Sequence, residues 1–145
     1  METKKFLERV LGDGYYSVLG LGDKKVQSFH ATIDDVISRA NELDAEGINA
    51  YFGLATFTTS NDRKVTNVKS LSSFYLDLDC GVGKEYPDQN TAFHDLKRFV
   101  KETGLPRPML INSGYGIHVY WVLTESVSYG EWLPVAQGLK DMCIQ

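Results

Sequence analysis

The sequence predicts an α+β domain built on a split β-α-β sheet, and three observations lead to that prediction. Turn-forming residues interrupt the chain at intervals that suit short strands and helices. Apolar or alternating segments, typical of strands, are separated by segments whose apolar residues recur every three to four positions, as in helices. The second half has the order strand, helix, strand, strand, helix, which suits helices on one face of a largely antiparallel sheet.

The overall composition favours one soluble domain covering residues 1–145. The chain has 145 residues, 43% hydrophobic and 23% charged, which is ordinary for a globular domain with a real core. A net charge of -4 argues against a surface that binds nucleic acid everywhere, so such contacts should be local. No apolar stretch approaches the roughly 20 residues that span a bilayer, and the N-terminus lacks a signal peptide, so we expect a cytoplasmic protein without a membrane partner. Cys80 and Cys143 form no C-x-x-C pattern and are expected to be reduced, packed thiols.

The first half of the chain predicts three strands and a helix. Residues 15–22 and 24–31 are short apolar runs around a Gly-Asp turn and are expected to be paired strands. An amphipathic helix should follow Thr32, whose side chain can cap it. Residues 50–59 are aromatic and β-branched, which predicts one strand, followed by a polar loop.

The second half predicts three more strands and two helices. A strand at 74–81 precedes a helix whose apolar face runs over 92–100. Residues 109–123 are expected to be two apolar strands joined by a glycine-rich turn. Ser128 and Glu131 then form a capping box, which predicts a last helix.

Two acids interrupt the apolar strand at 74–81. Strand alternation places Asp77 and Asp79 on one face with Tyr75, while the two leucines between them take the other face. Neighbouring carboxylates repel each other and are costly to desolvate unless a cation compensates, and Mg²⁺ and Mn²⁺ prefer such oxygen ligands. The alternative is a solvated strand end whose acids cap the turn at 81–83. We favour a metal site.

A second polar element joins the two later strands. Ser113 supplies a hydroxyl, Gly114 and Gly116 make backbone N–H groups accessible, and His118 supplies an imidazole at the start of the next strand. These groups are suitable donors to the phosphates of a nucleotide. A plain hairpin with a half-buried histidine explains the same residues equally well, so both interpretations stay open at this point.

Lysine and arginine residues precede the strand that carries the acids. Lys69 is retained as a candidate for contacting a triphosphate. Arg63 and Lys64 are interpreted as ordinary exposed cations of a loop.

Together, the two polar elements resemble a known family. LDLDCG followed by a helix, and then P-x-x-x-x-SGYGIHVYW, is similar to the D-x-D and Ser…His motifs of archaeo-eukaryotic primases (AEP), especially the primase–polymerases of phages and mobile elements. The resemblance covers about Tyr51–Met142, and the paired motifs are far more specific than either motif alone.

The resemblance implies an RRM-like catalytic core that transfers nucleotides to a 3′-hydroxyl in DNA replication with two metal ions. It implies that Asp77 and Asp79 bind Mg²⁺ or Mn²⁺, and that Ser113 and His118 contact the nucleotide. The implied partners are nucleoside triphosphates and a DNA template with a primer. The implied setting is the cytoplasm of a bacterial or archaeal host. A fused or associated helicase is a further candidate partner.

The resemblance also implies a third acidic motif, which would lie beyond Gln145. We therefore expect the chain to be the N-terminal and central part of a primase–polymerase catalytic domain. Two other hypotheses remain open: a non-catalytic module that binds nucleotide or nucleic acid within a replication protein, and a D-x-D glycosyltransferase that binds a nucleotide-sugar diphosphate. The Ser…His element has no obvious role in the glycosyltransferase.

Overall fold

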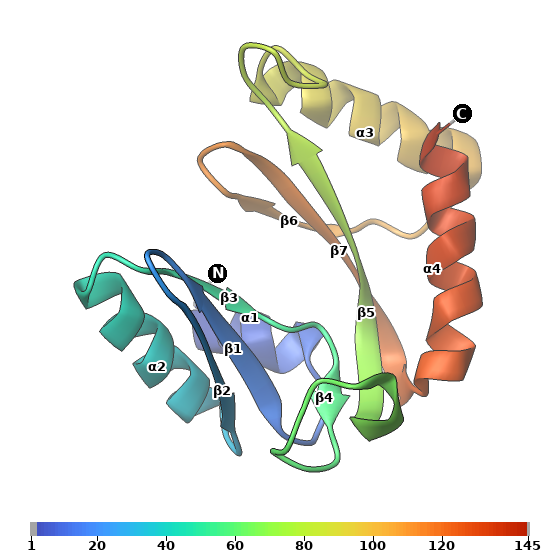
Figure 1. Cartoon of the computed structure of the whole chain (residues 1–145). Coiled ribbons are helices and arrows are strands. Elements are labelled where there is room, and N and C mark those ends of the chain that lie inside the picture. Colours follow the sequence, from blue (N-terminus) through green and yellow to red (C-terminus); the bar gives the residue numbers. More distant parts are fainter. Residues whose placement is uncertain (1–2, 145) are drawn as a thin grey trace. The chain divides into compact units, whose positions relative to one another are not determined.

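The computed structural model describes residues 3–144, and this part of the chain is a mixed α/β structure with four α-helices and two antiparallel sheets (Figure 1). The strand orders are β2-β1-β3 and β4-β5-β7-β6. The elements are α1 (Thr3–Val10), β1 (Tyr16–Leu21), β2 (Lys25–His30), α2 (Ile33–Ala45), β3 (Asn49–Phe52), β4 (Thr56–Phe57), a 3-10 turn (Val65–Asn67), β5 (Val68–Asp79), α3 (Gln89–Thr103), β6 (Met109–Asn112), β7 (Gly116–Val127) and α4 (Tyr129–Ile144).

The chain divides into two compact units, and the division falls within β5 and within β7. The first unit combines the residues up to Ser72 with those from Thr124 onward, and the second unit is Ser73–Leu123. The expectation that the chain behaves as one domain stays a prediction.

In the first unit, helix α2 packs on a three-stranded sheet, and α1 packs against α2. Strand β1 lies between β2 and β3, so that Leu19 pairs with Gln27 on one side and with Tyr51 on the other. Leu43 of α2 packs closely on β1. A Cβ atom added at Gly20 of β1 would lie only 3.1 Å from the Leu43 side chain. The predicted strand pair at 15–22 and 24–31 is confirmed.

The single strand expected over 50–59 is wrong, since the structure divides it into β3 and β4. The division falls at Gly53, whose N–H donates to the Ser17 carbonyl at 3.0 Å. A Cβ atom at Gly53 would lie 2.3 Å from Ser17 Oγ, so a larger residue would displace the Ser17 side chain at this approach to β1. Beyond this point the chain leaves the first sheet and β4 pairs with β5 in the second.

The predicted helix starts are confirmed by their caps. The Thr32 hydroxyl accepts a hydrogen bond from the Asp35 N–H at 3.1 Å at the start of α2. At the start of α4, Ser128 Oγ accepts from the Glu131 N–H at 3.2 Å, while Glu131 accepts from the Ser128 N–H at 3.3 Å. The short helix α1 was not predicted.

The second unit contains α3, β6 and the parts of β5 and β7 that carry the polar motifs. Strand β7 lies between β5 and β6, and it pairs with β6 in an antiparallel register that sets Ile111 opposite His118. The indole N–H of Trp121 donates to the Pro106 carbonyl at 2.8 Å, which fixes the connection before β6. The RRM-like arrangement, with helices on one face of the sheet, stays a prediction. The buried hydrophobic side chains of this unit are Phe74, Leu78, Ala92, Leu96, Ile117, Val119, Tyr120 and Trp121.

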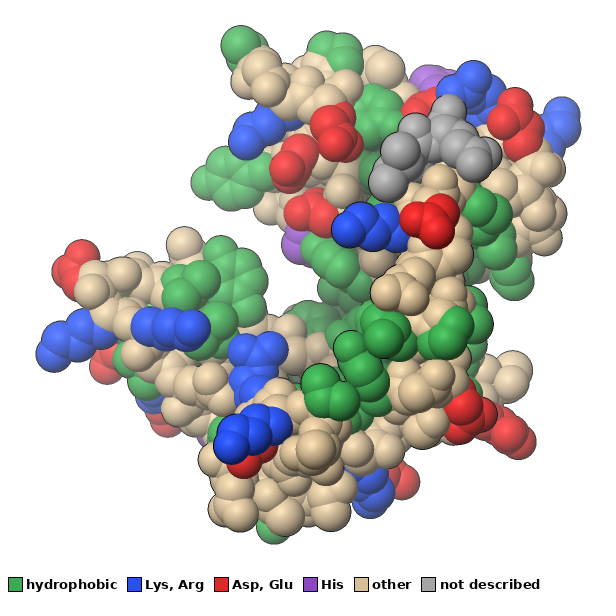
Figure 2. Space-filling view, turned by 45° about the vertical axis from the view of Figure 1, so that its right-hand side comes forward, with side chains coloured by type: hydrophobic (Ala, Val, Ile, Leu, Met, Phe, Trp, Pro, Cys, Tyr) green, Lys and Arg blue, Asp and Glu red, His purple; other side chains and the backbone are tan. Residues whose placement is uncertain are grey.

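The surface and the remaining sequence features are ordinary. On the face shown in Figure 2, the Lys and Arg side chains are interspersed with Asp and Glu, in line with the net charge of -4. Both cysteines are free, but Cys143 is exposed, so the expected packing of that thiol is wrong. Within residues 3–144, each helix is too short or too polar to cross a membrane.

Candidate functional site

Strand β5 presents its two acids on the face opposite Leu76 and Leu78, of which Leu78 is buried. Asp77 and Asp79 are exposed and Tyr75 is 39% exposed, whereas Leu78 is only 7% exposed. This alternation is the one predicted from the sequence. The carboxylates are therefore open to solvent and to a ligand, in a strand that is otherwise anchored in the core.

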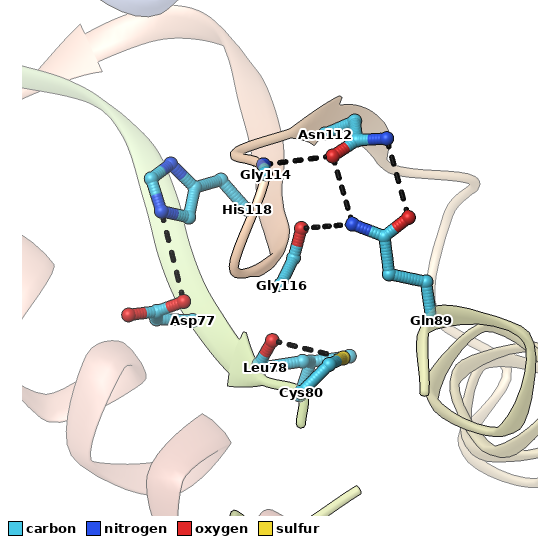
Figure 3. Close-up of polar contacts among 8 residues, drawn as sticks. All are labelled: Asp77, Leu78, Cys80, Gln89, Asn112, Gly114, Gly116 and His118. Carbon is cyan, nitrogen blue, oxygen red and sulfur yellow. Dashed lines mark hydrogen bonds and ion pairs between the residues drawn. The ribbon is translucent and has the colours of Figure 1, made fainter. Parts of the chain in front are cut away.

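His118 of β7 lies beside the first of these acids. Its Nε2 atom is 3.6 Å from Asp77 Oδ1, which is an ion-pair distance for a protonated imidazole and longer than a good hydrogen bond (Figure 3). The two side chains are 33% and 44% exposed, respectively. The structure thus brings together a histidine and an acid that the sequence placed in separate motifs.

Two tyrosines complete this group of side chains. The Tyr75 ring lies edge-on to the His118 ring, with centroids 5.4 Å apart, and 5.0 Å from the Tyr120 ring. Burial, and then the negative charge of Asp77, raise the pKa of Tyr120 to about 12. The same two causes, in the same order, raise the pKa of Tyr75 well above its usual value. At neutral pH both rings are uncharged phenols.

The loop between β6 and β7 is tied to the end of β5. The Cys80 N–H, one residue beyond Asp79, donates to the Tyr115 carbonyl at 2.9 Å. A Cβ atom at Gly116 would lie 2.1 Å from the Leu78 carbonyl oxygen, so no other residue fits there without moving the strands apart. Gly114 adopts a φ of 86°, in the left-handed region that favours glycine. Both glycines have a structural explanation, and their predicted contact with nucleotide stays a prediction.

Inside the loop, two backbone N–H groups already have acceptors. The Ser113 N–H donates to the Gly116 carbonyl at 3.1 Å, and the Gly114 N–H donates to Asn112 Oδ1 at 2.8 Å. The predicted role of the Ser113 hydroxyl and the His118 imidazole as donors to a phosphate stays a prediction.

A pair of side-chain amides supports the loop and was missed by sequence reasoning. Gln89, the first residue of α3, donates to Asn112 Oδ1 at 2.8 Å, and Asn112 donates back to Gln89 Oε1 at 3.2 Å (Figure 3). The only local signal was Asp88, a capping residue that marks the start of α3. It does not identify a partner 23 residues away.

Lys69 belongs to the first unit, outside the sequence stretch Ser73–Leu123 that contains the other site residues. There it lines a pocket of about 260 Å³ with Tyr15, Phe57 and Thr58. Its predicted contact with a triphosphate stays a prediction.

Asp77 and Asp79 could provide two oxygen ligands for a hard divalent cation such as Mg²⁺. Among the described residues, no three acidic, histidine or cysteine side chains are close enough together to hold a metal ion. Mg²⁺ is often held by only one or two carboxylates, with water and substrate phosphates completing its coordination. Asp77 and Asp79, exposed on one strand face, fit that donor chemistry.

Comparisons with known proteins identify a fold. No protein-family model matches the sequence, and neither does any curated protein. The structure is similar to that of an AEP domain of the primase–polymerase class. That domain comes from the cyanophage S-2L primase–polymerase (PrimPol); the TM-score is 0.68, the sequence identity is 16%, and the match covers 95% of this chain and 69% of that one. At this identity the likeness concerns the fold, and it supports the AEP-like fold expected from the sequence.

Proposed function

We propose that this chain carries the metal- and nucleotide-binding part of a DNA primase–polymerase, a nucleotidyltransferase. The observation that carries the proposal is the approach of the two polar motifs to each other. His118 lies 3.6 Å from Asp77, and the loop that contains Ser113 is bonded to the residue after Asp79. The AEP-like fold supports the proposal independently of these contacts.

Each side chain has a role that follows from its chemistry. Asp77 and Asp79 hold Mg²⁺ or Mn²⁺, and a cation bound there would offset phosphate charge and stabilise the attacking and leaving oxygens. Ser113 and His118 donate hydrogen bonds to phosphate oxygens and so orient the α-phosphate for attack by a 3′-hydroxyl. Asp77 also orients the His118 ring from one side, and the edge-on Tyr75 ring supports it from another.

The proposal includes the partners implied by the resemblance. The substrates are nucleoside triphosphates and a DNA template with a primer. Replication in the cytoplasm of a host cell is the proposed setting, with a fused or associated helicase as a further candidate partner.

The test is a calorimetric titration of a deoxynucleoside triphosphate into the protein, with and without Mn²⁺. We expect binding that requires Mn²⁺ and that is lost in the Asp77→Asn/Asp79→Asn double variant, because amides keep the shape of the acids but remove their charge. Asp141→Asn, an exposed acid on α4, is the matched control and should bind as the wild type does.

Three outcomes separate the hypotheses. If the double variant binds as tightly as the wild type, the assignment of the acids is wrong. Preference for a nucleotide-sugar over a triphosphate would favour the glycosyltransferase. If triphosphates bind but primers are not extended, even by a longer form of the chain that includes a third acid, the protein is a binding module.

A further inference from the structure

We infer that Gln89 and Asn112 are positioning residues, whose paired amides hold the Ser113–Gly116 loop in the geometry that binds nucleotide phosphates. The inference rests on the proposed function and adds two residues that belong to neither polar motif. Neither side chain needs to touch the ligand. Both act through the loop.

The pair is reciprocal, which fixes both side chains. The amide N–H of Gln89 donates to Asn112 Oδ1 at 2.8 Å, and that of Asn112 donates to Gln89 Oε1 at 3.2 Å. Two bonds between planar amides define their relative orientation as well as their distance. Gln89 Nε2 also lies 3.3 Å from the Gly116 carbonyl oxygen, to which it donates.

The pair reaches the loop at three places (Figure 3). Asn112 precedes the loop, its Oδ1 atom accepts from the Gly114 N–H at 2.8 Å in the middle, and Gln89 bonds the carbonyl of Gly116 at the end. Ser113 lies between these fixed points, so the position of its hydroxyl depends on them. Loss of the pair would leave the loop with fewer restraints and a larger entropy cost on binding a ligand.

Helix α3 gives the pair a rigid base and links it to the D-x-D strand. Its N-terminus is capped by Asp88, which accepts a hydrogen bond from the Thr91 N–H at 2.7 Å. Further along α3, Asp95 accepts from the Tyr86 hydroxyl at 2.5 Å, and the Tyr86 N–H donates to the Asp79 carbonyl at 3.3 Å. One helix therefore supports both the end of the strand with the acids and the loop with the phosphate donors.

The pair contributes more to position than to stability. Asn112 is exposed and Gln89 is half-buried, so water can replace each hydrogen bond that an alanine substitution removes. Variants at either position should fold. This makes the inference testable in the intact protein.

The experiment compares Gln89→Ala, Asn112→Ala, the double variant and Asn90→Ala, an exposed amide on the same helix. Each is titrated by calorimetry with Mn²⁺ alone and with a deoxynucleoside triphosphate in the presence of Mn²⁺. For the first three we expect about tenfold weaker triphosphate binding, with unchanged affinity for Mn²⁺ alone. The double variant should be no worse than Asn112→Ala, because the residues act as one unit. Asn90→Ala should match the wild type.

A second readout does not depend on nucleotide. Exchange of the Gly114 amide hydrogen, followed by NMR, should accelerate in Asn112→Ala and in Gln89→Ala but not in Asn90→Ala, because its acceptor is lost or loosened. Unchanged exchange in Gln89→Ala would overturn the inference.

The titrations distinguish failure of the inference from failure of the proposed function. If the wild type binds triphosphate with Mn²⁺ and the single variants bind equally well, the inference is wrong and the proposed function stands. Additive losses in the double variant would also overturn it, since the residues would then act separately. If the folded wild type binds no triphosphate, both the inference and the proposed function are wrong.

Discussion

The surroundings of Asp77 allow its carboxylate to contact His118 and a cation at the same time. Its carboxylate lies 3.6 Å from the His118 imidazole while 44% of the side chain stays exposed. It can therefore hold the histidine on one side and remain open to a cation on the other. A histidine oriented in this way can use its other ring nitrogen to reach a phosphate.

Replacing His118 by alanine should weaken triphosphate binding by about 1–3 kcal/mol, because one charge-assisted hydrogen bond is lost. Calorimetric titration in Mn²⁺ measures the change. His94→Ala, an exposed histidine on α3, is the control and should leave the affinity unaltered. Equal affinities for His118→Ala and wild type would make His118 an ordinary strand residue.

Replacing Gly116 by alanine should lower the free energy of unfolding by about 1–3 kcal/mol, since overpacking forces backbone apart. The added methyl would meet the Leu78 carbonyl oxygen at 2.1 Å. Urea unfolding measures the change. Gly138→Ala on α4, where nothing lies within 4 Å, should instead be neutral or stabilising. If Gly116→Ala has the same free energy of unfolding as the wild type, the close approach of these strands is contradicted.

At the scale of single elements, the cap of α2 offers a direct test of the fold of the first unit. Thr32→Ala removes the acceptor for the Asp35 N–H and should lower the free energy of unfolding by about 1 kcal/mol. Ser38→Ala, at an exposed site inside the same helix, should not destabilise the protein. Equal unfolding midpoints in urea for the wild type and Thr32→Ala would count against this helix start.

The stability of α3 should depend on pH through Asp95. Hydrogen bonds from Tyr86 and Arg98 lower the pKa of the Asp95 carboxyl below its usual value. The ionised form is thus favoured in the folded state. Its contribution to stability is present above the unfolded pKa and is lost as the pH falls through the lowered pKa.

Asp95→Asn should therefore reduce the loss of stability on acidification below about pH 4, because the group that titrates is gone. Thermal unfolding followed by circular dichroism over a pH series measures this slope. Asp44→Asn on α2 is the control for removal of an exposed acid. If the stability of Asp95→Asn falls with decreasing pH as steeply as that of the wild type, this carboxylate does not stabilise the folded state.

Elements whose signals are local were predictable, and those set by distant contacts were not. The caps at Thr32 and Ser128 lie within three residues of their partners, so sequence spacing identified them. The break after β3 depends on Gly53 meeting Ser17 of another strand, and no local pattern records that contact.

The candidate site shows the same limit. Alternation along one strand predicted that Asp77 and Asp79 share a face. The pairing of Asp77 with His118 required the order of the strands in the sheet, and the pairing of Gln89 with Asn112 required the position of a helix start beside a distant loop. Both are properties of tertiary structure.

At the scale of the whole molecule, the division into two units falls inside strands instead of at a linker. Strands β5 and β7 each contribute residues to both units. Unfolding either unit would therefore interrupt strands of the other. This continuity favours a single cooperative transition.

Native-state hydrogen exchange should accordingly give the same free energy for the most protected amides of each unit. Val18 in β1 and Val119 in β7 are suitable reporters, since both are buried. A clearly lower value for one unit would show that it opens independently and would contradict the prediction of one domain.

The acids, the proposed phosphate donors and the amide pair all belong to one uninterrupted stretch, Ser73–Leu123. During synthesis on the ribosome, the chain emerges from its N-terminus, so each of these residues is present before α4 has been made.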